Sequence, residues 1–324
     1  MFRRSLLPLF AATALPPTLP MAARAQGWTP DRSIRLVAPF AAGGAADIIS
    51  RIAAEELSPI LGQQVVVENR TGAGGAIGTE FVARARPDGL TLLTASQATH
   101  GITPVLTRLN FDPGTDTTPI ANFAGVPAVL IVNNDLPART LPEFLALVRA
   151  RPGQLAYGSA GIGSSTHMTL ALLAHKAGLD LTHVPYRGSA LAMPDLISGR
   201  LAAMTDTISS ALPFIRDGRV RAIAVSTTAR LAVLPDVPSV SETLPGYEVL
   251  NWYGISGPAG LPAPIVTTIH AAVQTILTRP AFRQRLASGG MEALPMSTAD
   301  YAAYIARDRA QWAELQRATG LRAD

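Results

Sequence analysis

Short apolar runs alternate with segments of helical periodicity along most of the chain. Residues 34–38, 65–68 and 91–94 are apolar or β-branched and predict short strands. Residues 47–61 carry apolar side chains at helical spacing, which predicts one buried helix face made of Ile48, Ile49, Ile52, Ala53 and Leu57. Gly62 follows as a C-terminal cap. This strand, helix, strand order predicts a mainly parallel sheet with helices on both faces.

The same order restarts in the second half of the chain. "QLAYGSAGIGSSTHMTLALLAHKAG", residues 154–178, predicts a strand, a glycine-rich turn and a helix. Residues 181–186, 190–199, 201–205 and 220–226 continue as strand, helix, strand and strand. The C-terminal part predicts helices that start near Pro262 and Ser297. Ser297 with Asp300 resembles a capping box, and Gly289-Gly290 ends the preceding helix.

Two long extended runs predict crossings between two lobes. "TPIANFAGVPAVLIVN", residues 118–133, is too long for one ordinary strand and is broken midway at Gly125-Val126-Pro127. "YEVLNWYGISGPAGLP", residues 247–262, is the second such run. We therefore expect one lobe from residues 26–125 and 252–324, a second lobe from residues 126–251, and a hinge of two strands.

The N-terminus is typical of an export signal. Arg3-Arg4 precedes the apolar stretch "SLLPLFAATAL", and a small-x-small site ends at Ala25 before Gln26. The stretch is shorter than the ~20 apolar residues that span a bilayer, so we expect residues 1–25 to be cleaved rather than to anchor the protein. Either the Sec or the twin-arginine route fits. The sequence contains no cysteine, which excludes disulfides, a thiol nucleophile and a lipid-modified cysteine.

Composition and charge exclude further classes. The chain has 324 residues, 48% of them hydrophobic, which is enough for a full core in two domains. Without Arg3, Arg4 and Arg24 of the leader, 24 basic side chains face 23 acidic ones, so we expect no nucleic-acid partner. Lys176 is the single lysine, which argues against a Schiff-base or phosphate-loop lysine.

The sequence gives little support for a metal or a dinucleotide. The histidines lack ligand spacing and an acidic cluster, so we expect no metal site; they are His100, His167, His175, His183 and His270. "NRTGAGGAIGTE" approaches the dinucleotide fingerprint, but Ile77 occupies the third glycine position. We therefore interpret this segment as a tight turn and expect no cofactor.

A serine hydrolase is the alternative from a different functional class. Such an enzyme needs Gly-x-Ser-x-Gly at a strand-to-helix turn. "YGSAG" offers Ser159, but Tyr157 stands where the first glycine belongs. An exported hydrolase would use Ser159 with His167 or His183.

Two strand-turn-helix loops are the main candidates for binding. The first N–H groups of a helix lack intrahelical partners and carry partial positive charge, and glycine lets an anion approach them. Gly43-Gly44 serves the first loop, and the second has Gly158, Gly161 and Gly163 with the hydroxyls of Ser159, Ser164 and Ser165. Either loop alone is equally compatible with tight packing and a plain N-cap. Because neither loop contains a lysine, we expect its neutral donors to bind a carboxylate rather than a phosphate.

Several segments together resemble one known family. "RLVAPFAAGGAADIISRIAAEEL", "VVVENRTGAGGAIGTEFVARARPDGLTLL", "LAYGSAGIGSSTHMTLALL", "THVPYRGSALAMPDLISGRLAAM" and "RLAVLPDVPSVSETLPGYE" follow in order and cover nearly all of the mature chain. They look like the Bug-type receptors, the extracytoplasmic solute-binding components of tripartite tricarboxylate transporters.

The resemblance implies an α/β, two-lobed periplasmic binding protein fold of type II-like topology. It implies a small organic acid as ligand: a di- or tricarboxylate, an acidic amino acid or an aromatic acid. In the family a pocket aspartate corresponds to Asp206, although Thr205 replaces the more usual aromatic residue before it. Asp206 is equally compatible with a cap or turn role. Phe40, Tyr186 and Trp252 are candidates for the cleft wall or for ordinary packing. Arg187 is either an exposed, solvated arginine, which we favour, or a partner for a distal carboxylate.

The predicted ligand-binding set comprises Pro39, Phe40, Ala41, Gly43, Gly44, Asp47, Ser96, Tyr157, Ser159, Gly161, Ser164, Ser165, His167, Tyr186, Gly188 and Asp206. We expect a periplasmic, monomeric, non-catalytic receptor without stable membrane insertion. It would close on its ligand and deliver the solute to integral-membrane permease subunits.

Overall fold

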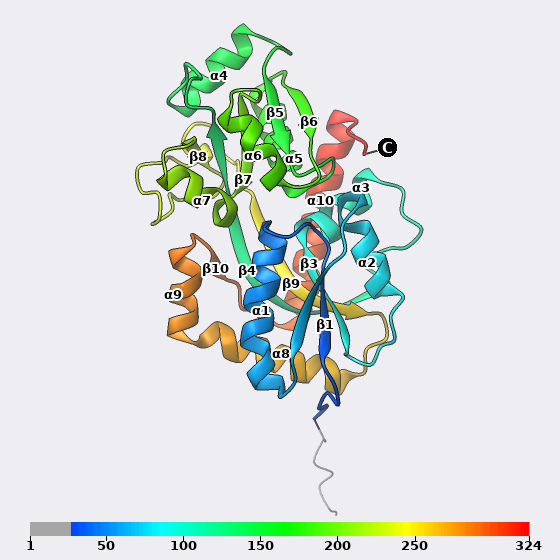
Figure 1. The fold of residues 1–324 in the computed structure, drawn as a ribbon. Helices are drawn as coiled ribbons and strands as arrows, with labels where there is room; N and C mark the ends of the chain where they lie inside the picture. Colours follow the sequence, from blue (N-terminus) through cyan, green and yellow to red (C-terminus); the bar gives the residue numbers. More distant parts are fainter. Residues whose placement is uncertain (1–26, 324) are drawn as a thin grey trace, which may run out of the picture.

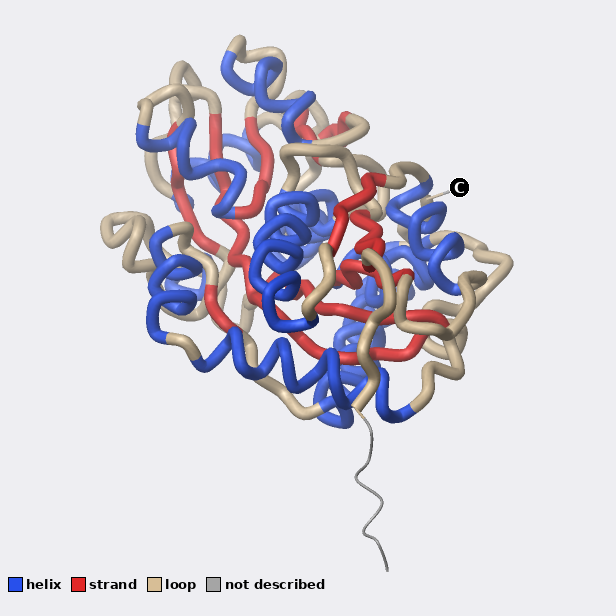
Figure 2. The backbone as a smooth tube through the Cα atoms, turned by 60° about the horizontal axis from the view of Figure 1, so that its bottom comes forward, coloured by secondary structure: helices blue, strands red, loops and turns tan. Residues whose placement is uncertain are grey.

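The computed structural model describes residues 27–323, which form two lobes joined by extended strands (Figure 1). The predicted export signal and its cleavage site at Ala25/Gln26 lie outside the described residues. Figure 2 shows strands running through both lobes, with helices packed against them. Within residues 27–323, no helix is both long and apolar enough to cross a membrane.

Lobe 1 is built on a mixed sheet. Its strands are β1 Ile34–Ala38, β2 Val65–Asn69, β3 Thr91–Ser96, the first part of β4 Thr117–Val132, β9 Leu250–Pro258 and β10 Glu292–Ala293. The order is β2-β1-β3-β9-β4, with β10 beside β4. β1 is parallel to β2 and β3, whereas β9 is antiparallel to β3 and β4.

Helices cover both faces of the lobe 1 sheet. They are α1 Ala45–Leu61, α2 Ala76–Ala83, α3 Thr103–Leu106, α8 Ala263–Thr278, α9 Pro280–Ser288 and α10 Thr298–Thr319, with the short helices η1 Ala73–Gly75 and η2 Gln97–Ile102. Successive side chains of a strand point to opposite faces of the sheet, so alternate residues pack into different hydrophobic cores. Leu36 packs in the core with α1 and α8, and Val37 packs in the core with α2 and α10.

Lobe 2 repeats this plan. Its strands are β5 Ala156–Ser159, β6 Thr182–Pro185, β7 Ala203–Thr207, β8 Arg221–Val225 and the second part of β4. β5 is parallel to β6 and β7, and β4 is antiparallel to β7 and β8. The helices are α4 Leu141–Ala150, α5 Ser165–Ala177, α6 Ser189–Ile197, α7 Ile208–Arg216 and the short η3 Val240–Glu242. α4 and α5 share one core, and α6 and α7 pack in another.

β4 is the first crossing between the lobes. Its residues up to Pro127 pair with β9, and its residues from Ala128 onward pair with β7 and β8. The strand is continuous, so the predicted break at residues 125–127 is instead the point where it changes sheets. The chain returns at Val249, whose N–H donates to Ser226 in lobe 2, before β9 joins lobe 1 at Leu250. The division at residues 125/126 and 251/252 stays a prediction.

Local sequence signals correctly predicted where several strands and helices begin or end. Residues 34–38 form β1 as predicted, and α1 begins at Ala45, two residues earlier than expected from Asp47. Gly62 adopts the left-handed conformation with φ 70° after α1, as a C-terminal cap requires. The Ser297 hydroxyl accepts a hydrogen bond from the Asp300 N–H, which confirms the cap of α10.

Candidate ligand-binding cleft

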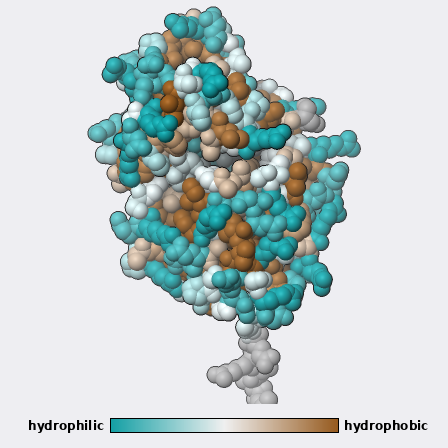
Figure 3. Space-filling model, viewed as in Figure 1, coloured by the Kyte–Doolittle hydropathy of each residue, from teal (hydrophilic) through white to brown (hydrophobic). Residues whose placement is uncertain are grey.

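A cleft of about 210 Å³ lies between the two lobes. In Figure 3 the surface is hollowed between the upper and lower lobes. The cleft is lined by the starts of α1, α5 and α6, by β9, and by the end of β7, where Thr207 is also the N-cap of α7. Its residues are Phe40, Ala41, Ala42, Gly44, Ala45, Ala46, Ala98, Ala160, Ser164, Ser165, Thr166, Arg187, Gly188, Ser189, Ala190, Leu191, Asp206, Thr207 and Tyr253.

The start of α1 contributes main-chain donors from lobe 1. Gly43 has φ +83°, a conformation that glycine adopts without strain, and it turns the chain into the helix. Gly44 is the N-cap and offers no side chain to the helix N–H groups. Gly44, Ala45 and Ala46 line the cleft. The orphan N–H groups of this 17-residue helix are therefore available to an anion in the cleft.

Asp47 lies behind this loop rather than on the cleft wall. Its carboxylate accepts hydrogen bonds from the Gly43 N–H at 3.1 Å, from Asn69 Nδ2 at 3.0 Å and from Arg51 Nε at 3.0 Å. Burial by itself would raise the pKa of Asp47, but the bonds with Arg51, Gly43 and Asn69 hold that pKa below its ordinary value. The ionised side chain thus fixes the shape of the loop.

The start of α5 contributes hydroxyl groups from lobe 2. Ser164 is the N-cap and accepts a hydrogen bond from the His167 N–H. Its own hydroxyl lies 2.7 Å from the Gly161 carbonyl, to which it donates. Thr166 Oγ1 accepts from the Ala160 N–H at 2.8 Å. Ser164, Thr166 and the intervening Ser165 line the cleft, and the capped loop holds them in place.

A third helix start completes the cleft. Gly188, with φ +149°, is the N-cap of α6 and supplies no side-chain cap. A Cβ at Gly188 would lie 3.6 Å from Cβ of Ala41, so the two lobes approach each other closely here. Gly188 belongs to the predicted set, although only the starts of α1 and α5 were predicted as anion sites. "YRGSALAM" carries the same signal, a glycine directly before an apolar helix.

Asp206 forms part of the cleft wall at the end of β7. It is 2% exposed, and its Oδ1 accepts a hydrogen bond from the Thr207 N–H at 2.8 Å. Burial raises the pKa of Asp206 to about 7. Burial also raises the pKa of Tyr253, with a further contribution from the charge of Asp206. An acid and a phenol from opposite lobes therefore share this part of the cleft.

Tyr253 lines the cleft although it is not in the predicted set, whereas its neighbour Trp252, a predicted candidate, does not. The two residues are neighbours on β9 and point to opposite faces. Tyr253 lines the cleft, whereas the buried Trp252 donates its Nε1–H to Asp308 Oδ2 at 3.0 Å behind the strand. Only the pairing of β9 with β3 and β4 determines which face meets the cleft, and no local sequence signal records that pairing.

Ser159 forms a buried pair with His183. Ser159 Oγ lies 2.7 Å from His183 Nε2, and the Ser159 side chain is fully buried. The rings of Tyr157, His167 and His183 stack, with centroids 4.0 Å apart for the two histidines. Burial lowers the pKa of His183 to about 4 and that of His167 to about 3. Neither Ser159 nor these rings line the cleft, so the arrangement packs the lobe rather than presenting a nucleophile.

The other predicted residues lie around the cleft in several ways. Phe40 and Ala41 line it, and both also line an adjoining hollow of about 620 Å³ together with Gly161, Tyr186 and Arg187. The Tyr186 hydroxyl donates to Asp195 at 2.6 Å. Pro39 and Ser96 line neither space: Pro39 packs near Gly78, and Ser96 caps η2. Gly72, Gly74 and Gly75 of the segment interpreted as a tight turn line the adjoining hollow.

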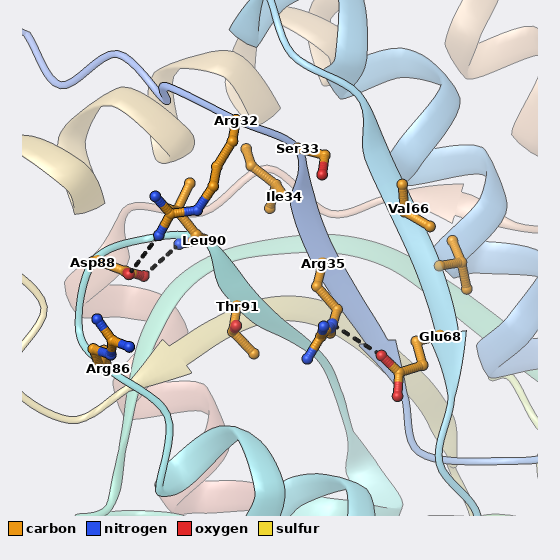
Figure 4. Close-up of a pocket in the computed structure, with 11 residues that line it drawn as sticks. Arg32, Ser33, Ile34, Arg35, Val66, Glu68, Arg86, Asp88, Leu90 and Thr91 are labelled. Carbon is orange, nitrogen blue, oxygen red and sulfur yellow. Dashed lines mark hydrogen bonds and ion pairs between the residues drawn. The ribbon is translucent and has the colours of Figure 1, made fainter.

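A further hollow of about 600 Å³ lies elsewhere on lobe 1, over β1 to β3 (Figure 4). Its arginines include Arg32 and Arg35, which pair with Asp88 at 3.6 Å and Glu68 at 2.9 Å. No helix of the described chain starts in its lining. It therefore lacks the donors that distinguish the inter-lobe cleft.

Comparison with known proteins gives the family. The sequence model described as "Tripartite tricarboxylate transporter family receptor" matches residues 49–321. The chain belongs to this receptor family. The resemblance seen in the sequence is thereby confirmed.

Solved structures of similar proteins share the fold of this receptor. Rpa4515 of R. palustris, solved with adipate, is 32% identical with a TM-score of 0.87, covering 90% of this chain and 99% of its own. The periplasmic binding protein BugD is 35% identical with a TM-score of 0.85, covering 90% and 99%. MatC from Rhodopseudomonas palustris, solved with bound malate, is 34% identical with a TM-score of 0.83, covering 88% and 99%. The predicted two-lobed binding-protein fold is confirmed.

The receptor is accordingly a periplasmic solute-binding protein. The family and the similar structures are solute-binding receptors and not enzymes. The buried position of Ser159 agrees with that class, since a hydrolase must expose its nucleophile to substrate.

Proposed function

We propose that this receptor captures a small organic acid with two carboxylates in the inter-lobe cleft and delivers it to permease subunits of a tripartite transporter. The observation that carries the proposal is the meeting of three helix starts in one cleft. Those of α1 and α6 have no side-chain cap, and that of α5 places the Ser165 hydroxyl at the cleft. The adipate and malate bound by two similar proteins support a dicarboxylate.

The energetics of neutral donors suit such a ligand. A hydrogen bond to a charged group contributes about 1.5–3 kcal/mol. Micromolar affinity needs about 8 kcal/mol, and association costs several kcal/mol more. About four to six such bonds, divided between two carboxylates, meet that requirement. The cleft of about 210 Å³ is smaller than the roughly 300–1,000 Å³ typical of drug-sized ligands, which favours a small acid.

The position of Asp206 in the cleft narrows the choice of ligand further. An ionised Asp206 repels a carboxylate, whereas it accepts a hydrogen bond from an ammonium, a hydroxyl or a bridging water. Tyr253 adds a hydroxyl beside it. We therefore favour a dicarboxylate with a hydroxyl or ammonium between its ends over a tricarboxylate or a simple aromatic acid.

Capture is proposed to proceed by closure of the hinge. Residues 26–125 with 252–324 would move against residues 126–251, and each lobe would contribute donors, so the ligand favours the closed state through contacts made only there. The mechanism needs neither a cofactor nor catalysis. The proposed contacts are the cleft-lining members of the predicted set, with Tyr253 added, and the protein would act as a monomer.

The proposal is tested by isothermal titration calorimetry of the mature protein with malate, adipate, aspartate, citrate and benzoate. We expect malate or aspartate to bind best, and at a hundredfold its Kd the best ligand should stabilise the fold by about 2.7 kcal/mol. Gly44→Val should abolish binding and leave the fold intact, because the new Cβ meets only Ala41 O at 3.5 Å.

Gly27→Val is the matched control for this substitution, since its Cβ would meet only Thr268 Oγ1 at 3.7 Å and the residue lies outside the cleft lining. This variant should bind like the wild type. Absence of binding to all five acids, or equal affinity in Gly44→Val and the wild type, would contradict the proposal.

A further inference from the structure

The two crossings between the lobes run side by side through the hinge (Figure 1). Pro127 of β4 is the register partner of Leu250 of β9. β4 pairs with β9 up to this point, and beyond it β4 pairs with β8, starting at the Val129–Val225 pair. Ser226, the residue directly after β8, therefore lies where the partner of β4 changes from lobe 1 to lobe 2.

Ser226 is buried and forms hydrogen bonds with both crossings. Its N–H donates to the Ala128 carbonyl at 2.8 Å, and its hydroxyl oxygen accepts from the Ala128 N–H at 2.9 Å. The same hydroxyl donates to the Val249 carbonyl at 2.6 Å, and the Ser226 carbonyl accepts from the Val249 N–H at 2.9 Å. The main chain and the hydroxyl group of this one residue thus hold both crossings to lobe 2.

Lobe 1 holds the neighbouring residues of the same crossings. Val126 is the register partner of Asn251, whose Nδ2 also donates to the Val126 carbonyl at 3.1 Å. Gln97 Nε2 in η2 donates to the Leu250 carbonyl at 3.2 Å. On β4, only Pro127 separates the residue held by lobe 1 from the residue held by lobe 2. On the returning crossing, the two residues held by opposite lobes are adjacent in the sequence.

Pro127 restricts how β4 can bend at this position. It has no N–H to donate to either sheet, and its ring fixes φ at about −65°. The residue before a proline is also restricted to extended conformations. Bending of β4 between the two lobes is therefore confined largely to rotation about ψ of Pro127, which limits the directions in which the lobes can move.

We propose that the lobes rotate about Pro127 and the junction of Val249 with Leu250, and that Ser226 is a positioning residue that makes both crossings move with lobe 2. The inference rests on the closure included in the proposed function, and it moves the division between the lobes from 125/126 and 251/252 to Pro127 and 249/250. Hinges of this kind consist of a few residues that absorb the change in φ and ψ. Without the Ser226 hydroxyl, both crossings can bend over a longer stretch, so the free receptor should sample a wider range of angles between its lobes.

The test measures distances between the lobes in the ligand-free receptor by double electron–electron resonance. The sequence contains no cysteine, so Ala146→Cys in α4 and Ala271→Cys in α8 provide the two attachment sites for spin labels. Both alanines are exposed, and the two helices lie at opposite ends of the molecule (Figure 1). Ser226→Ala should broaden the distribution of distances between the labels.

Ser239→Ala is the matched control. Ser239 is fully buried, and its hydroxyl donates to the Thr227 carbonyl and accepts from the Ser241 N–H, so these hydrogen bonds stay within lobe 2. Urea unfolding should show a loss of stability for both serine variants, because each leaves buried groups unsatisfied. Only Ser226→Ala should change the distance distribution, which separates control of the hinge from a general loss of stability.

Replacement of Pro127 tests the pivot without altering Ser226. Pro127→Ala frees φ at the pivot, so it should also broaden the distance distribution. Pro119→Ala is its control, because Pro119 lies in the same strand but pairs with Ser256 inside the lobe 1 sheet. This control should retain the distribution of the unsubstituted receptor. If Ser226→Ala fails to fold, the comparison of the two proline variants decides the inference.

The distances are measured without ligand, so a receptor that binds no organic acid would contradict the proposed function and not the hinge inference. Where an acid binds, its Kd should rise by at least about threefold in Ser226→Ala and stay unchanged in Ser239→Ala, because a wider range of angles lowers the binding-competent fraction. The inference is overturned if Ser226→Ala or Pro127→Ala gives the distance distribution of the unsubstituted receptor, or if either control broadens it equally.

Discussion

Two carboxyl groups near the cleft have opposite environments. Asp47 is held ionised by Arg51, Asn69 and the Gly43 N–H, and it organises the first loop from behind. Asp206 is buried without a paired cation, and its pKa rises to about 7. The first group maintains structure, and the second is free to interact with a ligand at a cost in stability.

The burial of Asp206 should make the free energy of unfolding depend on pH. Its pKa of about 7 in the fold exceeds the ~3.9 of an unfolded chain. The protonated group therefore stabilises the fold fully below about pH 4, and this contribution is lost as pH rises through about 7. Urea unfolding of wild type and Asp206→Asn should agree near pH 4, and the variant should become more stable by a few kcal/mol above about pH 7. A difference that does not change with pH would contradict this assignment.

Ser159 is expected to contribute stability rather than catalysis. Its Oγ accepts from the Gly161 N–H at 3.1 Å and pairs with His183 at 2.7 Å. Ser159→Ala leaves these buried groups unsatisfied, so the free energy of unfolding should fall by about 1–3 kcal/mol. Urea unfolding measures the loss, and a p-nitrophenyl ester assay serves as the control. Ester hydrolysis by the wild type that disappears in the variant would instead support the hydrolase alternative.

At the scale of elements, the helix starts define the site. Those of α1 and α5 were predictable from the sequence, because a strand, glycines and a long apolar helix follow one another there. α6 was predicted as a helix over residues 190–199, but the single glycine before it, Gly188, was not interpreted as an anion site because it lacks the glycine cluster of the other two loops. The strand ends were predictable because they depend on local apolar runs.

Two N-cap serines separate a binding role from a purely structural one. Ser164 caps α5 and lines the cleft, whereas Ser297 caps α10 outside it. Replacement of either by alanine should destabilise the protein by ~1 kcal/mol. Calorimetry with the best organic acid should show weaker binding only for Ser164→Ala. Equal affinities of the two variants would place the ligand away from the start of α5.

At the scale of the whole molecule, the cleft is assembled from segments far apart in the sequence. Gly44 and Tyr253 come from lobe 1, and Ser164, Gly188 and Asp206 come from lobe 2. Local patterns predicted the lobes and their loops, but the meeting of these residues depends on strand pairing and on how the lobes pack. The same pairing places Tyr253 in the cleft and Trp252 on the opposite face of β9.

The most direct test of the account is a crystal structure of the receptor with its tightest-binding organic acid. We predict one carboxylate at the main-chain N–H groups of Ala45 and Ala46, directly or through one water. The other carboxylate should lie at the start of α5 or α6. A ligand outside the inter-lobe cleft, or one whose carboxylates contact only Arg187, would contradict the claim that helix starts capture the acid.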